Sequence, residues 1–121
     1  MFVESYKNLI VWQKAVDLVI KIYKLTDDFP KPEIYGIVSQ IRRSAISIPS
    51  NIAEGRRRAT SKDFHHFLTI AIASGAELET QIIISKKLNF GKENKYLEIE
   101  NLMDEIMKML NKLINTIKQK Y

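Results

Sequence analysis

Residues 35–59 read YGIVSQIRRSAISIPSNIAEGRRRA, and this stretch decides the fold of the 121-residue chain. When its residues are placed at about 100° intervals, the apolar side chains fall on one face of an α-helix, as a helix packed against a core requires. This core stripe comprises Ile34, Ile37, Ile41, Ala45, Ile48, Ile52 and Gly55. The stretch therefore predicts a long amphipathic helix, which we expect to span residues 32–57.

A second set of residues on the same helix is polar and regularly spaced. Its members recur at alternating spacings of four and three residues, on a face about 100° away from the core stripe. This polar stripe comprises Gln40, Ser44, Ser47, Asn51, Glu54 and Arg58. Solvation alone does not require such regular spacing, so the pattern predicts hydrogen bonding across a helix–helix contact or across a contact between subunits.

Pro49 lies inside this predicted helix. It lacks the N–H that would bond the carbonyl of Ala45, and we therefore expect a kink at this position. The competing interpretation is a full break of the helix, with Ser47 capping a new helix.

The rest of the chain also has a helical period, and no segment alternates with the period of two that a half-buried strand needs. The predicted helices span residues 8–26, 61–88 and 93–118. Asn8 is the expected N-cap of the first, Thr60 or Ser61 begins the third helix of the chain, and the Asn89-Phe90-Gly91 sequence ends it. Because the three connections are short, the whole chain is predicted to be one all-α domain over residues 1–121, an antiparallel up-down-up-down four-helix bundle.

The helical period also predicts which side chains face the core. On the first helix the expected inward residues are Trp12, Ala15, Val16, Val19, Tyr23 and Thr26. The buried residues expected on the other helices are Ile41, Ile48, Phe67, Leu78, Ile106 and Leu113.

The composition restricts the classes of protein to which the chain can belong. Hydrophobic residues make up 45% of the chain, with only 4 Gly and 3 Pro, which favours a folded helical protein over a disordered one. The chain has no Cys, so it holds no disulfide or thiolate metal site, and we expect it to be cytoplasmic. Its first residues do not resemble a signal peptide, and no apolar stretch approaches the ~20 residues of a transmembrane helix. We therefore expect no membrane association.

The positive charge is concentrated in the middle of the chain. Between Lys31 and His66 there are seven basic and three acidic residues, a net charge of +4 out of +5 for the whole chain. This segment holds all five arginines, whose planar fork suits phosphate better than the point charge of lysine. The candidate nucleic-acid-binding residues are Arg42, Arg43, Arg56, Arg57, Arg58 and Lys62. The alternative roles are interaction with the helix dipole and salt bridges between subunits.

The spacing of the arginines suggests how they would act. Arg42 and Arg56 are separated by 14 residues, and so are Arg43 and Arg57. Because 14 is a multiple of the seven-residue helical repeat, the arginines form two outward rows on a helix, which suit a phosphate backbone. No base-reading motif accompanies them, and no aromatic residue interleaves with them as a stacking platform. Binding is therefore expected to have little sequence preference.

Ile46 lies almost opposite the core stripe, close to Ala53 and Tyr35. An apolar patch that faces away from its own core indicates a partner. We therefore expect self-association, with an interface formed by Gln40, Ser44, Ile46, Ser47, Asn51 and Glu54.

No pattern in the sequence indicates catalysis or metal binding. His65 and His66 are adjacent, so they cannot chelate a metal as an i, i+4 pair does. There is no Gly-x-Ser-x-Gly elbow and no phosphate-binding glycine loop. Glu79 lies near the edge of its core stripe, where a free carboxylate is costly, and we expect it to pair with Arg42 or Arg43. We expect a protein that is not an enzyme and has no cofactor.

Residues 39–55, SQIRRSAISIPSNIAEG, resemble the signature of the 23S rRNA intervening-sequence protein family, also called the four-helix bundle protein family. Residues 8–15, NLIVWQKA, resemble its opening helix. Its third helix is matched by Phe64, Phe67, Leu68, Ala71, Ser74, Glu77, Leu78 and Glu79. The resemblance implies an antiparallel four-helix bundle that assembles as a ring, commonly a homopentamer. It also implies kinship with the accessory protein of diversity-generating retroelements, a basic bundle that binds nucleic acid and a reverse transcriptase.

Three functions of different classes follow from these patterns. The favoured hypothesis is a non-enzymatic oligomeric module that binds the RNA or DNA backbone through a basic surface. The first alternative is a protein-interaction adaptor, such as a reverse-transcriptase accessory subunit, whose basic surface meets an acidic protein. The second alternative is a purely structural ring.

Overall fold

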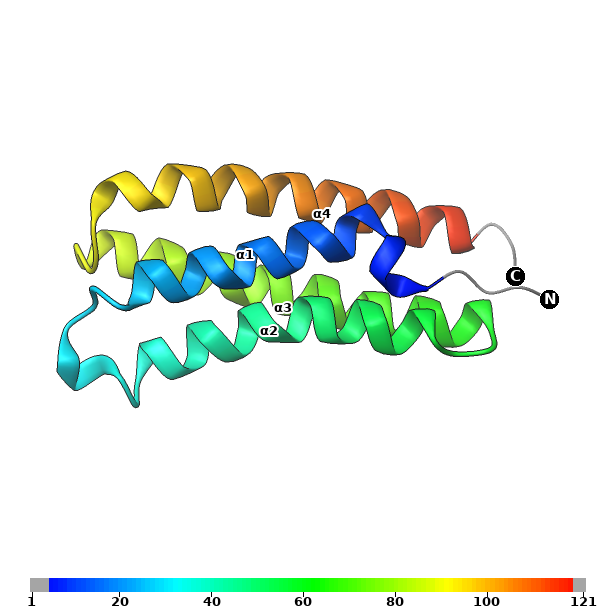
Figure 1. Cartoon of the computed structure of the whole chain (residues 1–121), viewed down its shortest axis with the longest axis horizontal. Coiled ribbons are helices and arrows are strands. Elements are labelled where there is room, and N and C mark those ends of the chain that lie inside the picture. Colours follow the sequence, from blue (N-terminus) through cyan, green and yellow to red (C-terminus); the bar gives the residue numbers. More distant parts are fainter. Residues whose placement is uncertain (1–4, 119–121) are drawn as a thin grey trace.

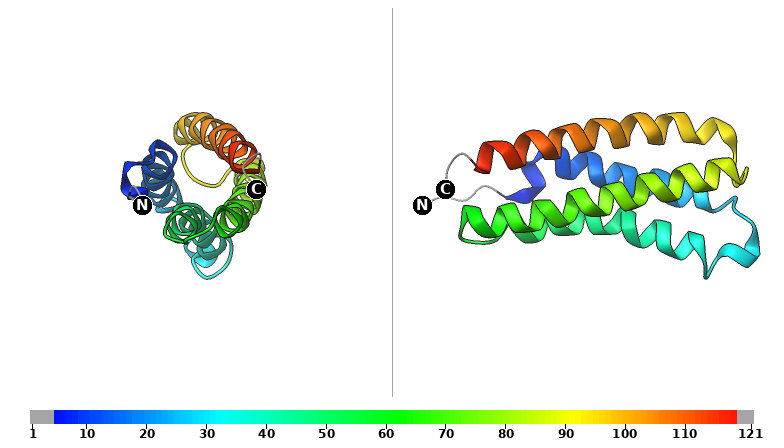
Figure 2. Two further views of the ribbon diagram at one scale, coloured as in Figure 1. Left: turned by 90° about the vertical axis from the view of Figure 1, so that its right-hand side faces the viewer. Right: turned by 180° about the vertical axis from the view of Figure 1, so that it is seen from behind.

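The computed structural model describes residues 5–118 and forms an antiparallel four-helix bundle, with no strand in that range (Figure 1). The helices are α1 (Ile10–Thr26), α2 (Ile37–Arg56), α3 (Ser61–Lys87) and α4 (Tyr96–Lys118). Short 3-10 segments lie at Tyr6–Asn8, Lys31–Glu33 and Glu93–Lys95. Consecutive helices pack against each other and α1 also packs against α4, so α2 and α4 are diagonal across the bundle, as its end view shows (Figure 2). The predicted all-α, up-down-up-down fold is confirmed.

Three predicted helix starts are wrong, and in each case a 3-10 turn precedes the α-helix. α4 begins at Tyr96 instead of residue 93, because Glu93–Lys95 form such a turn. α2 begins at Ile37 instead of residue 32, because the backbone of Gly36 (φ −106°, ψ −114°) is outside the helical region and separates α2 from the preceding 3-10 turn. Asn8 does not cap α1, because it ends another 3-10 turn and Leu9 occupies the N-cap position without a side-chain hydrogen bond.

The ends of α3 agree with the prediction. The side chain of Thr60 accepts a hydrogen bond of 3.1 Å from the backbone N–H of Asp63 and caps the first turn. At the other end, Asn89 has a φ of 59°, and the backbone N–H groups of Asn89 and Phe90 bond back to the carbonyls of Lys86 and Ser85. This is the hydrogen-bond pattern of a Schellman motif, in which an αL residue stops the helix.

The α3–α4 connection is fixed further by Tyr96. Its hydroxyl donates a hydrogen bond of 2.6 Å to the carbonyl of Phe90. Burial raises the pKa of Tyr96 to about 12, so the hydroxyl keeps its proton and remains a donor at neutral pH. Phe90 in turn packs against Phe29 in the α1–α2 connection, with ring centroids 5.5 Å apart.

α2 is continuous through Pro49, whose side chain is buried. The alternative of a full break with Ser47 capping a new helix is therefore wrong. The kink expected from the missing N–H stays a prediction.

Most residues of α2, α3 and α4 that the helical period predicted to face the core are buried in the structure. Ile41, Ile48, Leu78 and Ile106 are fully buried. Phe67 and Leu113 are only half-buried, and Ile34 is exposed because it precedes α2.

The inner face of α1 is rotated by about one residue relative to the prediction. Its buried residues are Val11, Ala15, Leu18, Ile22, Leu25 and Thr26. The predicted residues Trp12, Val16 and Val19 are half-buried, and Tyr23 is exposed. Ile10, Ile20 and Tyr23 of α1 are apolar but lie outside its buried face, so the period alone allowed two faces. Ion pairs from Lys14 and Lys21 to Glu105 and Glu98 of α4 are consistent with the face that the structure adopts.

α2 and α3 approach closely near their shared loop. A Cβ atom built on Gly55 would lie 2.7 Å from Cβ of Phe67 and 3.0 Å from Cδ1 of Phe64. Any larger side chain at this position would have to push the two helices apart. Gly55 therefore holds the basic end of α2 against the first turns of α3.

α3 is long and apolar enough to cross a membrane by length and composition alone, with a mean hydropathy of 1.4 over its most apolar window. The sequence predicted no apolar stretch near the length of a transmembrane helix, and by length and composition that prediction was wrong. A third of the window is buried inside the bundle, and the core helix of a soluble bundle passes the same test.

Candidate nucleic-acid interface

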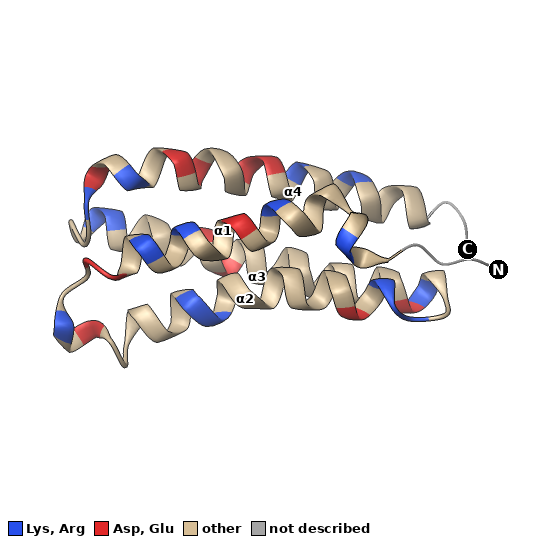
Figure 3. Cartoon of the chain, viewed as in Figure 1, with Lys and Arg blue, Asp and Glu red and all other residues tan. Residues whose placement is uncertain are grey.

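The predicted nucleic-acid-binding residues form two separate basic regions (Figure 3). Arg42 and Arg43 lie in the first half of α2, whereas the others lie around the α2–α3 loop. This second region comprises Arg56, Arg57, Arg58 and Lys62. The acidic residues of α4 lie on the helix diagonally opposite α2, so they do not neutralise either region directly.

Arg42 is engaged within the chain. Its Nε donates a hydrogen bond of 2.9 Å to Oγ1 of Thr26, and its Nη2 lies 3.1 Å from Oδ1 of Asp27. The guanidinium carbon also lies 4.3 Å from the centre of the Tyr23 ring. Arg42 therefore ties α2 to the end of α1, with one face of its guanidinium stacked on an aromatic ring.

Two arginines near the loop are partly engaged as well. Arg58 forms an ion pair of 2.6 Å with Glu54, and its guanidinium lies 4.9 Å from the centre of the Phe67 ring. Arg56 lies over the ring of Phe64 at 5.8 Å, and its Nε is buried without a hydrogen-bond acceptor among residues 5–118.

The remaining three candidates are available to a partner. Arg43, Arg57 and Lys62 are exposed, and within the described part of the chain none of them has an acidic partner. Arg43 and Arg57 are about 21 Å apart along the helix axis and about 40° apart around it. Arg43 lies in the first region and Arg57 and Lys62 in the second, and we call these three exposed cations together the α2 cation surface.

The polar stripe of α2 forms hydrogen bonds within the chain. Oγ of Ser44 donates a hydrogen bond of 2.6 Å to Glu77 of α3, and the hydroxyls of Ser47 and Ser74 lie 2.8 Å apart. Asn51 donates to the carbonyl of Ser47, on its own helix, at 2.8 Å. The helix–helix role predicted for the stripe is confirmed for Ser44 and Ser47, and Ser44 has little surface left for another subunit because it is buried. For Gln40 and Glu54, which are exposed, the subunit interface stays a prediction.

The apolar patch around Ile46 borders a groove that the sequence did not reveal. Ile46 is 42% exposed and Tyr35 is 95% exposed. Together with Tyr23 of α1 and other residues of α2 and the segment before it, they line an open groove of about 480 Å³, which we call the Tyr35 groove. Its lining residues are Tyr23, Ile34, Tyr35, Val38, Ser39, Arg42, Arg43 and Ile46. The sequence placed no aromatic residue among the arginines, because Tyr23 comes from another helix and Tyr35 precedes α2.

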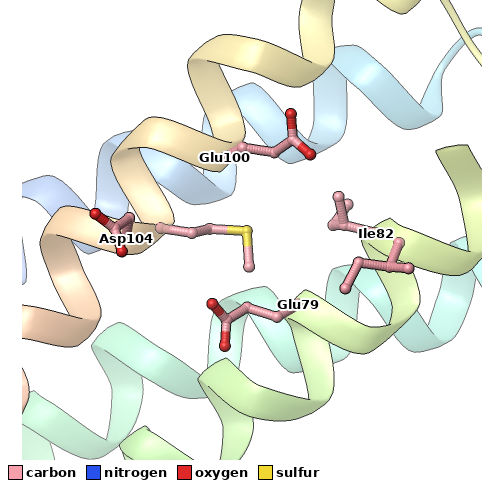
Figure 4. A pocket seen from close by; sticks show the side chains of 6 residues that line it. Glu79, Ile82, Glu100 and Asp104 are labelled. Carbon is pink, nitrogen blue, oxygen red and sulfur yellow. The ribbon is translucent and has the colours of Figure 1, made fainter.

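Glu79 does not pair with Arg42 or Arg43, so that prediction is wrong. Glu79 lies across from Glu100 and Asp104 of α4, where these side chains line a pocket of about 240 Å³ (Figure 4). The face of α3 that meets α2 carries Ser74 and Glu77 instead. Because Glu79 is only half-buried, its carboxylate does not need a partner to offset burial.

Residues 5–118 contain no group of three or more His, Cys, Asp or Glu side chains placed to hold a metal ion. The three carboxylates beside the α3–α4 pocket do not form such a group, and Glu100 is paired with Lys86 at 3.2 Å. The functional candidates among the described residues are therefore the α2 cation surface and the Tyr35 groove.

Residues 7–112 match the 23S rRNA-intervening sequence protein family. The chain belongs to this family. A crystal structure of a protein of unknown function from the S23 ribosomal protein family of Bacteroides thetaiotaomicron has a similar fold, with a TM-score of 0.76 and 25% sequence identity. The match covers 87% of this chain and 98% of that one. No curated protein matches this chain significantly. The resemblance to the 23S rRNA-intervening sequence proteins that residues 39–55 suggested is confirmed.

Proposed function

We propose that this protein is a non-enzymatic, oligomeric four-helix bundle that binds the backbone of RNA or DNA through the α2 cation surface. The observation that supports this function is the exposure of Arg43, Arg57 and Lys62 without acidic partners in the described part of the chain. Such cations release counterions from nucleic acid when they neutralise phosphates, and this release drives binding. The length of the surface suits a run of phosphates better than a single anion.

Contacts to phosphates position a protein on nucleic acid but carry no sequence information. We therefore expect the protein to bind unrelated sequences with similar affinity. The test is fluorescence anisotropy at low salt, with labelled oligonucleotides of one length and two unrelated sequences, each as a single strand and as a duplex. Comparable binding of both sequences supports the proposal, whereas no binding of any of the oligonucleotides at low salt contradicts it.

We further propose that the protein is a homo-oligomer, with a ring of five favoured by its family resemblance. Exposed Ile46 and its neighbour Ala53 on the outer face of α2 support a subunit contact in the middle of that helix. A ring would place several α2 cation surfaces on one particle and raise the affinity for a long nucleic acid through multivalency.

Light scattering tests self-association, because a mass near the 14.1 kDa of one chain would contradict it. Ile46→Glu is expected to reduce the particle to single chains, since it places a charge in an apolar contact. Its circular dichroism spectrum should remain that of the unchanged protein, because Ile46 is not part of the core. Leu97→Glu, at an exposed position of α4, is the matched control and should keep the mass of the oligomer.

The alternative function is that of an adaptor whose basic surface meets an acidic protein, such as a reverse transcriptase. It is favoured by the same exposed cations. This alternative replaces the first proposal if a purified oligomer fails to bind nucleic acid at low salt.

A further inference from the structure

The Tyr35 groove combines three features that suit a partner with aromatic rings and negative charge. The Tyr35 ring is 95% exposed, although an aromatic side chain gains stability by burial. Arg43, whose side chain is exposed, lines the same groove. The lining also contains a cation–π pair, in which the guanidinium of Arg42 lies 4.3 Å from the centre of the Tyr23 ring.

We propose that the Tyr35 groove binds single-stranded nucleic acid, with Tyr35 stacking on an unpaired base and Arg43 contacting a phosphate. This inference rests on the proposed binding to nucleic acid and specifies the strand form and the residues. Aromatic side chains next to cations are the usual platform for single strands, because every base has a π-face and every nucleotide carries a phosphate.

The size and charge of the groove fit this partner. A volume of about 480 Å³ lies within the range of sites for small organic ligands, which is the size class of a nucleotide. The lining contains two arginines and no acidic residue. Asp27, which pairs with Arg42, orients that guanidinium against Tyr23 and does not line the groove.

The position of the groove relates it to the α2 cation surface. Arg43 belongs to both, so the phosphate contact proposed for the groove is also one of the contacts proposed for the α2 cation surface. Ile46 lines the groove but belongs to the proposed subunit contact, so the residue proposed to stack on the base is Tyr35. A duplex can contact the cations in the same way, but its bases are already paired and stacked inside the helix. Tyr35 is therefore expected to distinguish single strands from duplexes.

The test compares Tyr35→Ala with the unchanged protein in anisotropy titrations with a single-stranded oligothymidine and a duplex of equal length. We expect Tyr35→Ala to weaken single-strand binding by roughly fivefold to a hundredfold, the usual effect of removing one stacked aromatic ring. Duplex binding and the salt dependence of single-strand binding should not change, because the ring carries no charge. Tyr35→Phe keeps the ring and should restore the affinity. Leu97→Ala, an equally superficial change on α4, is the control.

Arg43→Gln provides a second readout. It should reduce the steepness of the salt dependence on single strands by about 0.7, the value for one phosphate contact. If Tyr35→Ala binds single strands as well as the unchanged protein does, the groove proposal is wrong while binding through the α2 cation surface stands. If the unchanged protein binds neither oligonucleotide, both proposals fail. If Tyr35→Ala instead lowers the mass in light scattering, the groove is a contact between subunits, and the proposal is also wrong.

Discussion

Replacing Ile106 by alanine is expected to lower the free energy of unfolding by about 2–5 kcal/mol. Ile106 is 1% exposed and lies near the middle of α4, within the single core formed by the four helices. Removing its side chain costs the transfer of the lost methyl groups and leaves a cavity among side chains that relax only in part. Because small domains have a total stability of about 5–15 kcal/mol, this loss is a large fraction of the whole.

Urea denaturation, followed by circular dichroism, measures the effect. Leu97→Ala is the matched control, because Leu97 is on the same helix but 66% exposed, and it should change the stability by no more than about 0.5 kcal/mol. Equal effects of the two substitutions would mean that the register of α4 against the core is wrong.

The second large effect is expected from Arg57→Gln combined with Lys62→Gln. These residues are the exposed cations of the α2–α3 region that have no acidic partner among the described residues, and each is expected to neutralise about one phosphate. Their loss should reduce the salt slope on single strands by about 1.4 and weaken binding at low salt by roughly tenfold to a hundredfold. Arg56 and Arg58 are left in place, because they lie over Phe64 and Phe67 and their removal would also disturb packing.

The matched control for this pair is Lys24→Gln combined with Lys87→Gln. It removes the same charge from exposed positions on α1 and α3, at the end of the bundle away from the α2–α3 loop. A similar loss of affinity in both pairs would show that only the net charge matters. Unchanged binding in the Arg57 and Lys62 pair would instead favour the adaptor alternative.

The core positions of α2, α3 and α4 could be predicted from the sequence because their buried apolar residues recur with the helical period, although Ile83 and Ile84 of α3 are exposed. On α1 the exposed residues Ile10, Ile20 and Tyr23 are apolar as well, and the period did not identify which residues face the core. The helix starts were missed for a local reason. Asn8 and Pro32 are residue types that favour the start of an α-helix, but each lies in a short 3-10 turn before the helix. The sequence pattern does not distinguish such a turn from the first turn of an α-helix.

The site was predicted only in part, because its properties depend on contacts between helices. The sequence identified the basic region, but it could not show that Arg42 is held by Thr26 and Asp27 at the end of α1. It likewise assigned Glu79 to an arginine on α2, although the rotation of α3 directs it toward α4. The sequence indicated exposed Tyr35 only as a neighbour of Ile46, and its position in the same groove as Arg43 depends on the α1–α2 connection.

The salt dependence of binding by the unchanged protein tests the proposed function most directly. With three to five phosphate contacts, the logarithm of the affinity for a single strand should fall linearly with the logarithm of the salt concentration, with a slope of about −2 to −3.5. Anisotropy titrations over a fourfold to fivefold range of salt should then show a loss of roughly two orders of magnitude in affinity. No binding at low salt, or an affinity that does not change with salt, would contradict binding to the nucleic-acid backbone.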